Sequence, residues 1–168
     1  MPTLKIVNGY GKYQDDNAIH DAITYIWLPW KIPHGVIGGT NVDLSDPVNS
    51  MIAHAMNFNK YSRTRLRHYI LSFDPQWRVD LGLLARAAAY ISENIGKVYP
   101  NVYAVHEDKV YYHIHFIVSP ISVKGYRYRG SHDEYRFLLF QMNVYLHGFN
   151  LGNVIPVKYK PDESENNG

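Results

Sequence analysis

Two short runs of β-forming residues in the second half of the chain constrain the fold most. Residues 102–106 and residues 112–119 are rich in valine, isoleucine and aromatic residues, and a short polar connector separates them. Two such runs joined by so short a link are typical of a β-hairpin. We therefore expect an antiparallel pair of core strands here.

Three histidines lie in this hairpin. His113 and His115 alternate with Ile114, so on a strand both imidazoles point to one face, about 6–7 Å apart. If the connecting loop has even length, His106 falls opposite His113 or His115 and shares their face. Three converging imidazoles leave coordination positions open, as in a catalytic metal site. The alternative is ordinary strand histidines, in a chain that has nine. Because polar rings on a core strand need partners, the metal site is favoured.

The remaining pattern mixes helices and strands without a regular repeat. We predict further strands over residues 4–7, 69–73 and 154–159. Helices are expected from the caps at residues 15–17 to before Pro29, from Pro47 to about Phe58, over residues 81–95 closed by Gly96, and over residues 133–146. The order predicts an α+β fold, with one mainly antiparallel central sheet backed by helices in a two-layer sandwich.

Length and composition fit one folded domain. The chain has 168 residues, 46% of them hydrophobic, and we expect a domain over residues 1–160 with a polar tail over residues 161–168. No cysteine occurs, so a metal must bind imidazole, carboxylate or water. No apolar run approaches the roughly 18–20 residues of a membrane span, and no leader pattern is visible, so we expect a cytoplasmic protein.

The positive charge is gathered in two clusters, although the net charge is only +2. The first consists of Lys60, Arg63, Arg65 and Arg67, and the second of Lys124, Arg127 and Arg129, interleaved with Tyr126 and Tyr128. Cations alternating with aromatic rings suit single-stranded nucleic acid, whose phosphates need positive charge and whose bases stack on flat surfaces. The first cluster fits a solvated helix end about equally well.

Three motifs in order resemble the relaxases of the HUH endonuclease class, particularly the plasmid and integrative-element mobilization type. The family's metal motif is similar to His106, Asp108, His113 and His115. Residues 68–73, HYILSF, look like the family's middle motif, which ends in Ser-Phe and is associated with DNA contact near the nick. Residues 22–26 with Pro29 and Lys31 resemble the first motif, in which Tyr25 occupies the place of the nucleophile. Residues 148–155 are similar to the segment that closes the domain, whereas Ser119-Pro120 stands where members often carry asparagine.

This resemblance implies an HUH-type fold and a nuclease that nicks single-stranded DNA at a transfer origin by metal-dependent transesterification. Tyr25 would attack the phosphorus, leaving a 5′-phosphotyrosine and a 3′-hydroxyl. The metal would be Mg²⁺ or Mn²⁺, or Zn²⁺ or another transition metal, which imidazoles hold more tightly. Asp108 would orient an imidazole or take part in proton transfer, with Glu107 as an alternative orienting group. Ser72, His68 and Lys31 would contact DNA with the arginines, and accessory relaxosome proteins would be further partners.

The sequence is compatible with several alternatives. Tyr25 is one of fifteen tyrosines, and an aromatic residue on an amphipathic helix usually packs in the core. Tyr10 and Tyr13 are other possible nucleophiles, and His20 is an outside candidate. Competing functions are a non-catalytic DNA-binding module, a metal enzyme acting on another substrate, and a rolling-circle replication initiator. A tyrosine that precedes the histidines favours a relaxase over an initiator, and the short chain would be a minimal or truncated nicking core.

Overall fold

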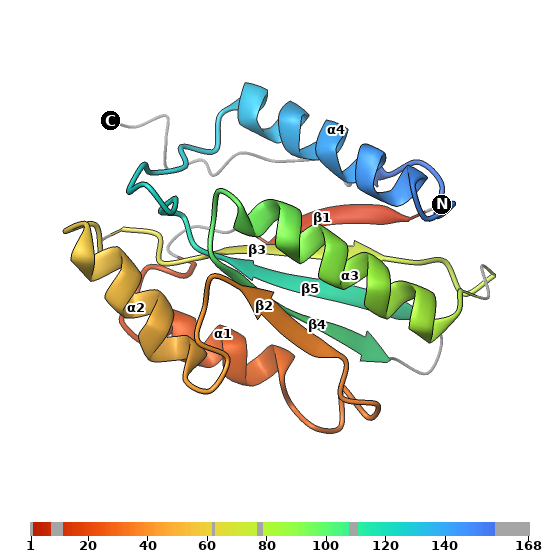
Figure 1. The fold of residues 1–168 in the computed structure, drawn as a ribbon, viewed down its shortest axis with the longest axis horizontal. Helices are drawn as coiled ribbons and strands as arrows, with labels where there is room; N and C mark the ends of the chain where they lie inside the picture. The colour runs from red at the N-terminus through yellow and green to blue at the C-terminus, as the bar shows by residue number, and fades with distance from the viewer. Residues whose placement is uncertain (1, 8–11, 62, 77–78, 108–110, 157–168) are drawn as a thin grey trace.

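The computed structural model describes residues 2–7, 12–61, 63–76, 79–107 and 111–156. The elements, shown in Figure 1, follow in the order β1 (Thr3–Val7), α1 (Ala18–Ile26), β2 (Ile37–Thr40), α2 (Pro47–Asn57), β3 (Arg67–Ser72), α3 (Leu81–Gly96), β4 (Asn101–Glu107), β5 (Tyr112–Val118), α4 (His132–His147) and β6 (Ile155–Pro156). None of the helices in these ranges is long and apolar enough to cross a membrane.

The strands form one sheet in the order β2-β4-β5-β3-β1-β6. Every neighbouring pair is antiparallel except β1 and β6, which run parallel. The hairpin expected from the sequence is β4–β5, in the interior of the sheet, and the α+β prediction with a mainly antiparallel sheet is confirmed. The predicted last strand appears as β6, while residues 157–159 and the predicted tail at residues 161–168 lie outside the described residues.

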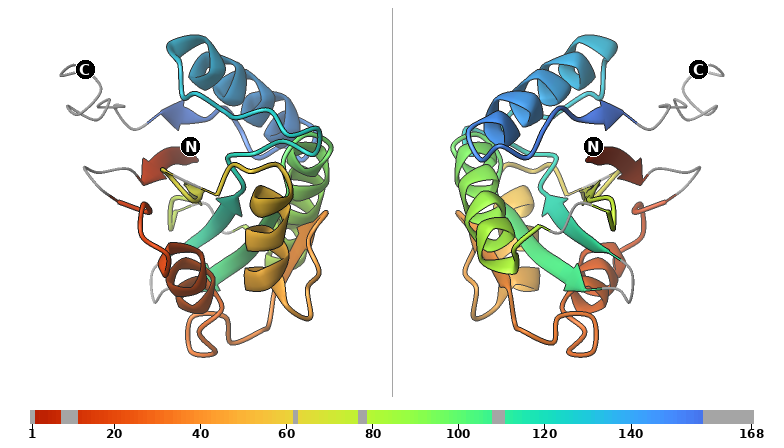
Figure 2. Two further views of the ribbon diagram at one scale, coloured as in Figure 1. Left: turned by 90° about the vertical axis from the view of Figure 1, so that its left-hand side faces the viewer. Right: turned by 90° about the vertical axis from the view of Figure 1, so that its right-hand side faces the viewer.

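Helices cover both faces of this sheet. On one face α3 and α4 pack against Tyr69, Leu71, Ile114 and Phe116, which alternate along β3 and β5. On the other, α1 and α2 pack against a smaller core that includes Val102, Ala104 and Ile117. Figure 2 shows the sheet between α1 on one side and α3 on the other. The structure thus adds a partial third layer to the expected two, because β4 is buried along both faces.

The helix boundaries follow the local sequence signals, with one exception. Helix α1 ends at Ile26, ahead of Pro29, and α2 begins at Pro47 as expected. Gly96 was predicted to close α3 from outside, but it is the last helical residue and is buried. A β-carbon at this position would collide with the side chain of Thr40 on β2. Gly96 therefore allows close approach of α3 to the sheet, which the local sequence pattern does not reveal.

Candidate active site

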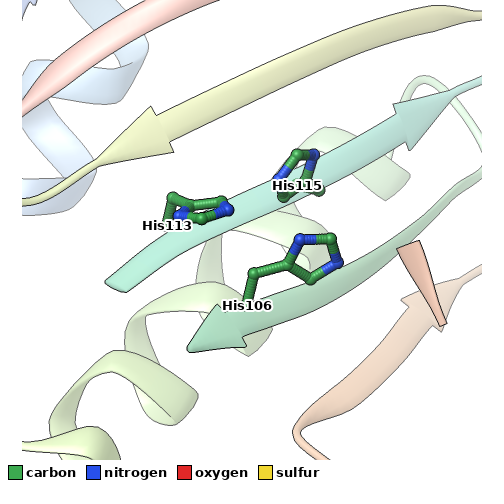
Figure 3. A group of neighbouring side chains, drawn as sticks. All are labelled: His106, His113 and His115. Atoms are coloured by element: carbon green, nitrogen blue, oxygen red, sulfur yellow. The ribbon is translucent and has the colours of Figure 1, made fainter. Parts of the chain in front are cut away.

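The three hairpin histidines converge on the face covered by α1 and α2. His106 near the end of β4 pairs with His113 on β5, and Ala104 pairs with His115, so all three imidazoles share one face. One nitrogen from each ring lies within 4.8 Å of the others. Figure 3 shows the three rings gathered above the two neighbouring strands. The predicted register is confirmed, and we call His106, His113 and His115 the histidine triad.

Hydrogen bonds outside the triad orient two of its rings. His106 donates through Nε2 to the carbonyl oxygen of Ile26, at 2.7 Å, and His115 is bonded through Nδ1 to Nε2 of His68, also at 2.7 Å. The remaining nitrogens, Nδ1 of His106 and Nε2 of His115, are buried without a hydrogen-bond partner among the described residues. Buried polar atoms of this kind call for an explanation. Their position among three imidazoles fits a divalent transition metal ion.

Burial favours the neutral form of His106, His115 and His68. Desolvation lowers the pKa of His106 and lowers that of His115 further, with neighbouring histidines adding to the effect on His115. The same cause, followed by the charge of Lys12, lowers the pKa of His68 to about 4. Neutral imidazoles offer a lone pair to a cation, so these rings are in their ligand form at neutral pH.

Tyr25 lies beside the triad at the last turn of α1. Its ring centroid is 5.9 Å from that of His106 and 6.2 Å from that of His115. The helix buries Ile19, Ile23 and Ile26, whereas the Tyr25 side chain is 45% exposed. The core-packing alternative for Tyr25 therefore does not hold.

The chain after α1 is anchored at the same end of the sheet. Lys31 places Nζ 4.9 Å from the centroid of the Tyr25 ring, and its carbonyl oxygen accepts a hydrogen bond of 3.0 Å from the backbone N–H of Glu107. Ile26, one residue after Tyr25, supplies the carbonyl that orients His106. The end of α1 thus presents a phenol and orients a triad ring together.

The other candidate nucleophiles have different surroundings. The Tyr13 hydroxyl is hydrogen-bonded to Nδ1 of His68 at 2.8 Å, and burial, with a smaller effect from Tyr25, raises the pKa of Tyr13 to about 12. His20 is exposed and is hydrogen-bonded to Asp21. Tyr10 lies outside the described residues. Of these candidates with described positions, Tyr25 combines exposure with ring contacts to the triad.

The predicted orienting and DNA-contacting residues near the triad differ in their positions. Asp108 lies outside the described residues, and Glu107 is paired with His34 at 2.7 Å. Ser72 pairs with His113 across β3 and β5, so it shares the triad face. His68 is only 5% exposed and touches the triad from beneath the surface, which differs from the position expected of a DNA contact.

The basic clusters meet at a cavity of about 620 Å³ that reaches His68. Its lining includes the cations Lys12, Lys60, Arg63, Arg67, Arg127 and Arg129, the rings of Tyr13, Tyr69, Tyr128 and Tyr135, and no carboxylate among the described lining residues. Burial lowers the pKa of Arg127, and the charges of Arg63 and Arg65 lower it further. An anion bound in the cavity would offset the like charges of these arginines.

The predicted cations are not equivalent. Arg65 is paired with Asp16 at 2.9 Å, and Lys124 is not among the residues that line the cavity. The guanidinium of Arg67 lies 3.5 Å from the centroid of the Tyr128 ring and donates to the Tyr69 hydroxyl, so it also holds the loop against β3. Lys12 and Tyr13 were missed as parts of this surface, because no sequence signal links them to residues 120–130.

Comparison with known proteins agrees with this geometry. The histidine triad could hold a metal ion on one face of the sheet. The family model "Relaxase: MobA/VirD2-like, nuclease domain" matches residues 32–141, more than half of the chain, and the protein belongs to this family. The match includes the triad and residues 68–73 but not Tyr25 or Lys31.

No curated protein matches the sequence. One chain from a solved structure described as "Molecular Basis of Vancomycin Resistance Transfer in Staphylococcus aureus" is 14% identical, with 73% of this chain and 74% of that chain covered and a TM-score of 0.43.

Proposed function

We propose that residues 1–160 act as a relaxase catalytic domain that nicks single-stranded DNA at a transfer origin, for conjugative transfer or mobilization. The observation that carries this proposal is the exposed phenol of Tyr25 beside a triad of converging imidazoles. Nucleophile, charge stabilisation and strand binding are the three requirements of the reaction, and each has candidate residues on the same face.

Tyr25 is the proposed nucleophile. Its hydroxyl oxygen forms a bond to the scissile phosphorus while the bond from phosphorus to the 3′ oxygen breaks. The phenol loses a proton and the departing 3′ oxygen gains one, so the products are a 5′-phosphotyrosine and a 3′-hydroxyl. Lys31, with Nζ 4.9 Å from the Tyr25 ring centroid, would hold a phosphate close to the phenol. Asp108 is proposed to orient an imidazole or to take part in this proton transfer.

His106, His113 and His115 would hold the divalent metal ion. Nδ1 of His106 and Nε2 of His115 are the ligand atoms that their other hydrogen bonds leave available. A bound cation would supply charge neutralisation at the non-bridging phosphate oxygens. Mg²⁺ or Mn²⁺ is proposed from the family, while three imidazoles bind Zn²⁺ and similar ions more tightly.

The cationic cavity is proposed to receive the single strand on its way to Tyr25. Arg63, Arg127 and Arg129 would contact phosphates, with Ser72 nearer the triad. Exposed rings at Trp30, 74% exposed, and Tyr126, 71% exposed, provide surfaces on which bases can stack. Accessory relaxosome proteins are proposed as further partners.

The test is a cleavage assay on single-stranded DNA from the element's candidate transfer origin, with Mn²⁺ and denaturing gels. Wild type should give a metal-dependent covalent protein–DNA band that Tyr25→Phe loses. Tyr90→Phe is the matched control, because Tyr90 is 44% exposed on α3, on the opposite face, and it should retain the band. DNA binding without any adduct would favour the non-catalytic module, and an adduct that persists in Tyr25→Phe would transfer the role to another residue such as Tyr13.

A further inference from the structure

A buried chain of hydrogen bonds connects the triad to Tyr13. His68 on β3 joins Nε2 to Nδ1 of His115 at 2.7 Å and Nδ1 to the Tyr13 hydroxyl at 2.8 Å. His68 and His115 are only 5% and 3% exposed. In the sheet His68 pairs with Ile117, so its side chain reaches the triad diagonally. Both ring nitrogens of His68 are thus committed to named partners.

The direction of these two hydrogen bonds decides whether His115 can bind a metal. A neutral imidazole has one N–H donor and one acceptor nitrogen. If the hydrogen of His115 is on Nδ1, it is donated to Nε2 of His68, and Nε2 of His115 keeps a free lone pair within the triad. His68 must then carry its own hydrogen on Nδ1 and donate it to the oxygen of Tyr13.

If both hydrogen bonds run in the opposite direction, Nε2 of His115 cannot bind a metal. If the Tyr13 hydroxyl donates to Nδ1 of His68, then His68 donates from Nε2 to Nδ1 of His115. The hydrogen of His115 would then be on Nε2, where it occupies the position needed for a metal bond. His106 has no such choice, because its partner is the carbonyl oxygen of Ile26, which only accepts. Of these two rings, His115 is therefore the one whose tautomer depends on another side chain.

We propose that His68 is a positioning residue that holds the ring of His115 and accepts the hydrogen of its metal-binding tautomer at Nε2, with the Tyr13 hydroxyl accepting the hydrogen of His68 in turn. The inference rests on the proposed metal site. Outer partners of ligand histidines commonly orient the ring in this way, and losing one typically weakens metal binding by about 10–100-fold. The competing interpretation is that His68 only satisfies a buried nitrogen of His115, with no effect on the metal.

The first experiment measures Co²⁺ affinity of the full chain by its visible absorption. His68→Leu removes the partner of His115, whereas the amide oxygen of His68→Gln can still accept from Nδ1. We expect about 10–100-fold weaker Co²⁺ binding in His68→Leu and recovery of most of the affinity in His68→Gln. Folded His68→Leu with wild-type affinity would overturn the proposal.

His54→Gln is the matched control. His54 is also partly buried, and its Nε2 is bonded to the carbonyl oxygens of Ile121 and Ser122, outside the triad. The expected Co²⁺ affinity of this variant is that of wild type. An equal loss in His54→Gln and His68→Leu would mean that any histidine lost from the packed interior weakens the site, and it would overturn the specific role of His68.

The second experiment uses the wild-type chain, so it does not depend on a variant that folds. Zn²⁺ is diamagnetic, and ¹⁵N NMR of the imidazoles reports which ring nitrogen carries hydrogen. In the Zn²⁺-bound protein we expect the hydrogen on Nδ1 in both His68 and His115. A hydrogen on Nε2 of His68 would overturn the proposal. Failure of wild type to bind Co²⁺ or Zn²⁺ would instead remove the proposed metal site itself, and with it the inference.

Discussion

The two faces of the β4–β5 hairpin use the same strands in opposite ways. Toward α3 and α4 the hairpin presents Tyr103, Val105, Ile114 and Phe116, which belong to the larger apolar core. Toward α1 and α2 the alternate positions carry the histidine triad. Successive residues of a strand point to opposite faces of the sheet. The same two strands therefore contribute apolar side chains to the core on one face and the histidine triad to the other.

The difference lies in how completely each face is covered. Helices α3 and α4 have 16 residues each, whereas α1 and α2 have 9 and 11. The shorter pair leaves His113 half-buried and Tyr25 exposed beside the triad. The candidate site therefore lies where α1 ends and no longer covers the sheet. Tyr25, in the last turn of α1, lies beside the triad there.

Substitution on the apolar face should give the largest change in stability. Phe116→Ala removes a ring that is 0% exposed, and we expect the free energy of unfolding to fall by about 3–5 kcal/mol. The measurement is urea unfolding followed by circular dichroism. A loss below about 1 kcal/mol would contradict the assignment of this face as the stabilising one.

The triad face should make stability depend on pH. The pKa of His68 is lowered from its ordinary value of 6.5 to about 4, and the pKa values of His106 and His115 are lowered as well. Between pH 6.5 and about pH 4, His68 binds a proton in the unfolded chain but stays neutral in the folded chain. The contribution of His68 is thus full above pH 6.5 and is lost as the pH falls toward 4, with a slope of about 1.4 kcal/mol per pH unit for each proton.

Urea unfolding across this pH window, with a chelator present, checks the dependence. His68→Leu should reduce the slope by about one proton, while Phe116→Leu, on the opposite face, should leave it unchanged. An equal slope in His68→Leu and wild type would show that His68 does not contribute.

The sequence predicted one face of the hairpin better than its surroundings. Strand period and loop parity place His106 opposite His113 or His115 without knowledge of the rest of the fold, and the observed partner is His113. The bond from His68 to His115 depends instead on β3 lying beside β5, a long-range pairing that no local pattern encodes. Gly96 was misinterpreted for the same reason, since Thr40 reaches it from a distant strand. Tyr25 was assigned by family resemblance, because a helix pattern alone places an aromatic residue in the core.

A triad residue should separate stability from metal binding. His113 is half-buried, so His113→Ala should change the free energy of unfolding by about 1 kcal/mol or less. Its Co²⁺ affinity should fall by at least about 100-fold, because even outer partners account for about 10–100-fold. Unfolding and Co²⁺ titration on one preparation check both values. Large destabilisation with unchanged affinity would assign His113 to the core instead.

The smallest effect is expected at the cationic cavity. Arg63 lines the cavity and is exposed, so Arg63→Gln should weaken binding of a single-stranded oligonucleotide and reduce the slope of log affinity against log salt by about 0.7, the value for one phosphate contact. Arg86→Gln is the matched control, because Arg86 is an exposed arginine on α3, over the apolar face. Fluorescence anisotropy at several salt concentrations measures both variants. If both variants change the slope equally, the charge acts through the electric field of the whole molecule. Arg63 would then have no specific phosphate contact in the cavity.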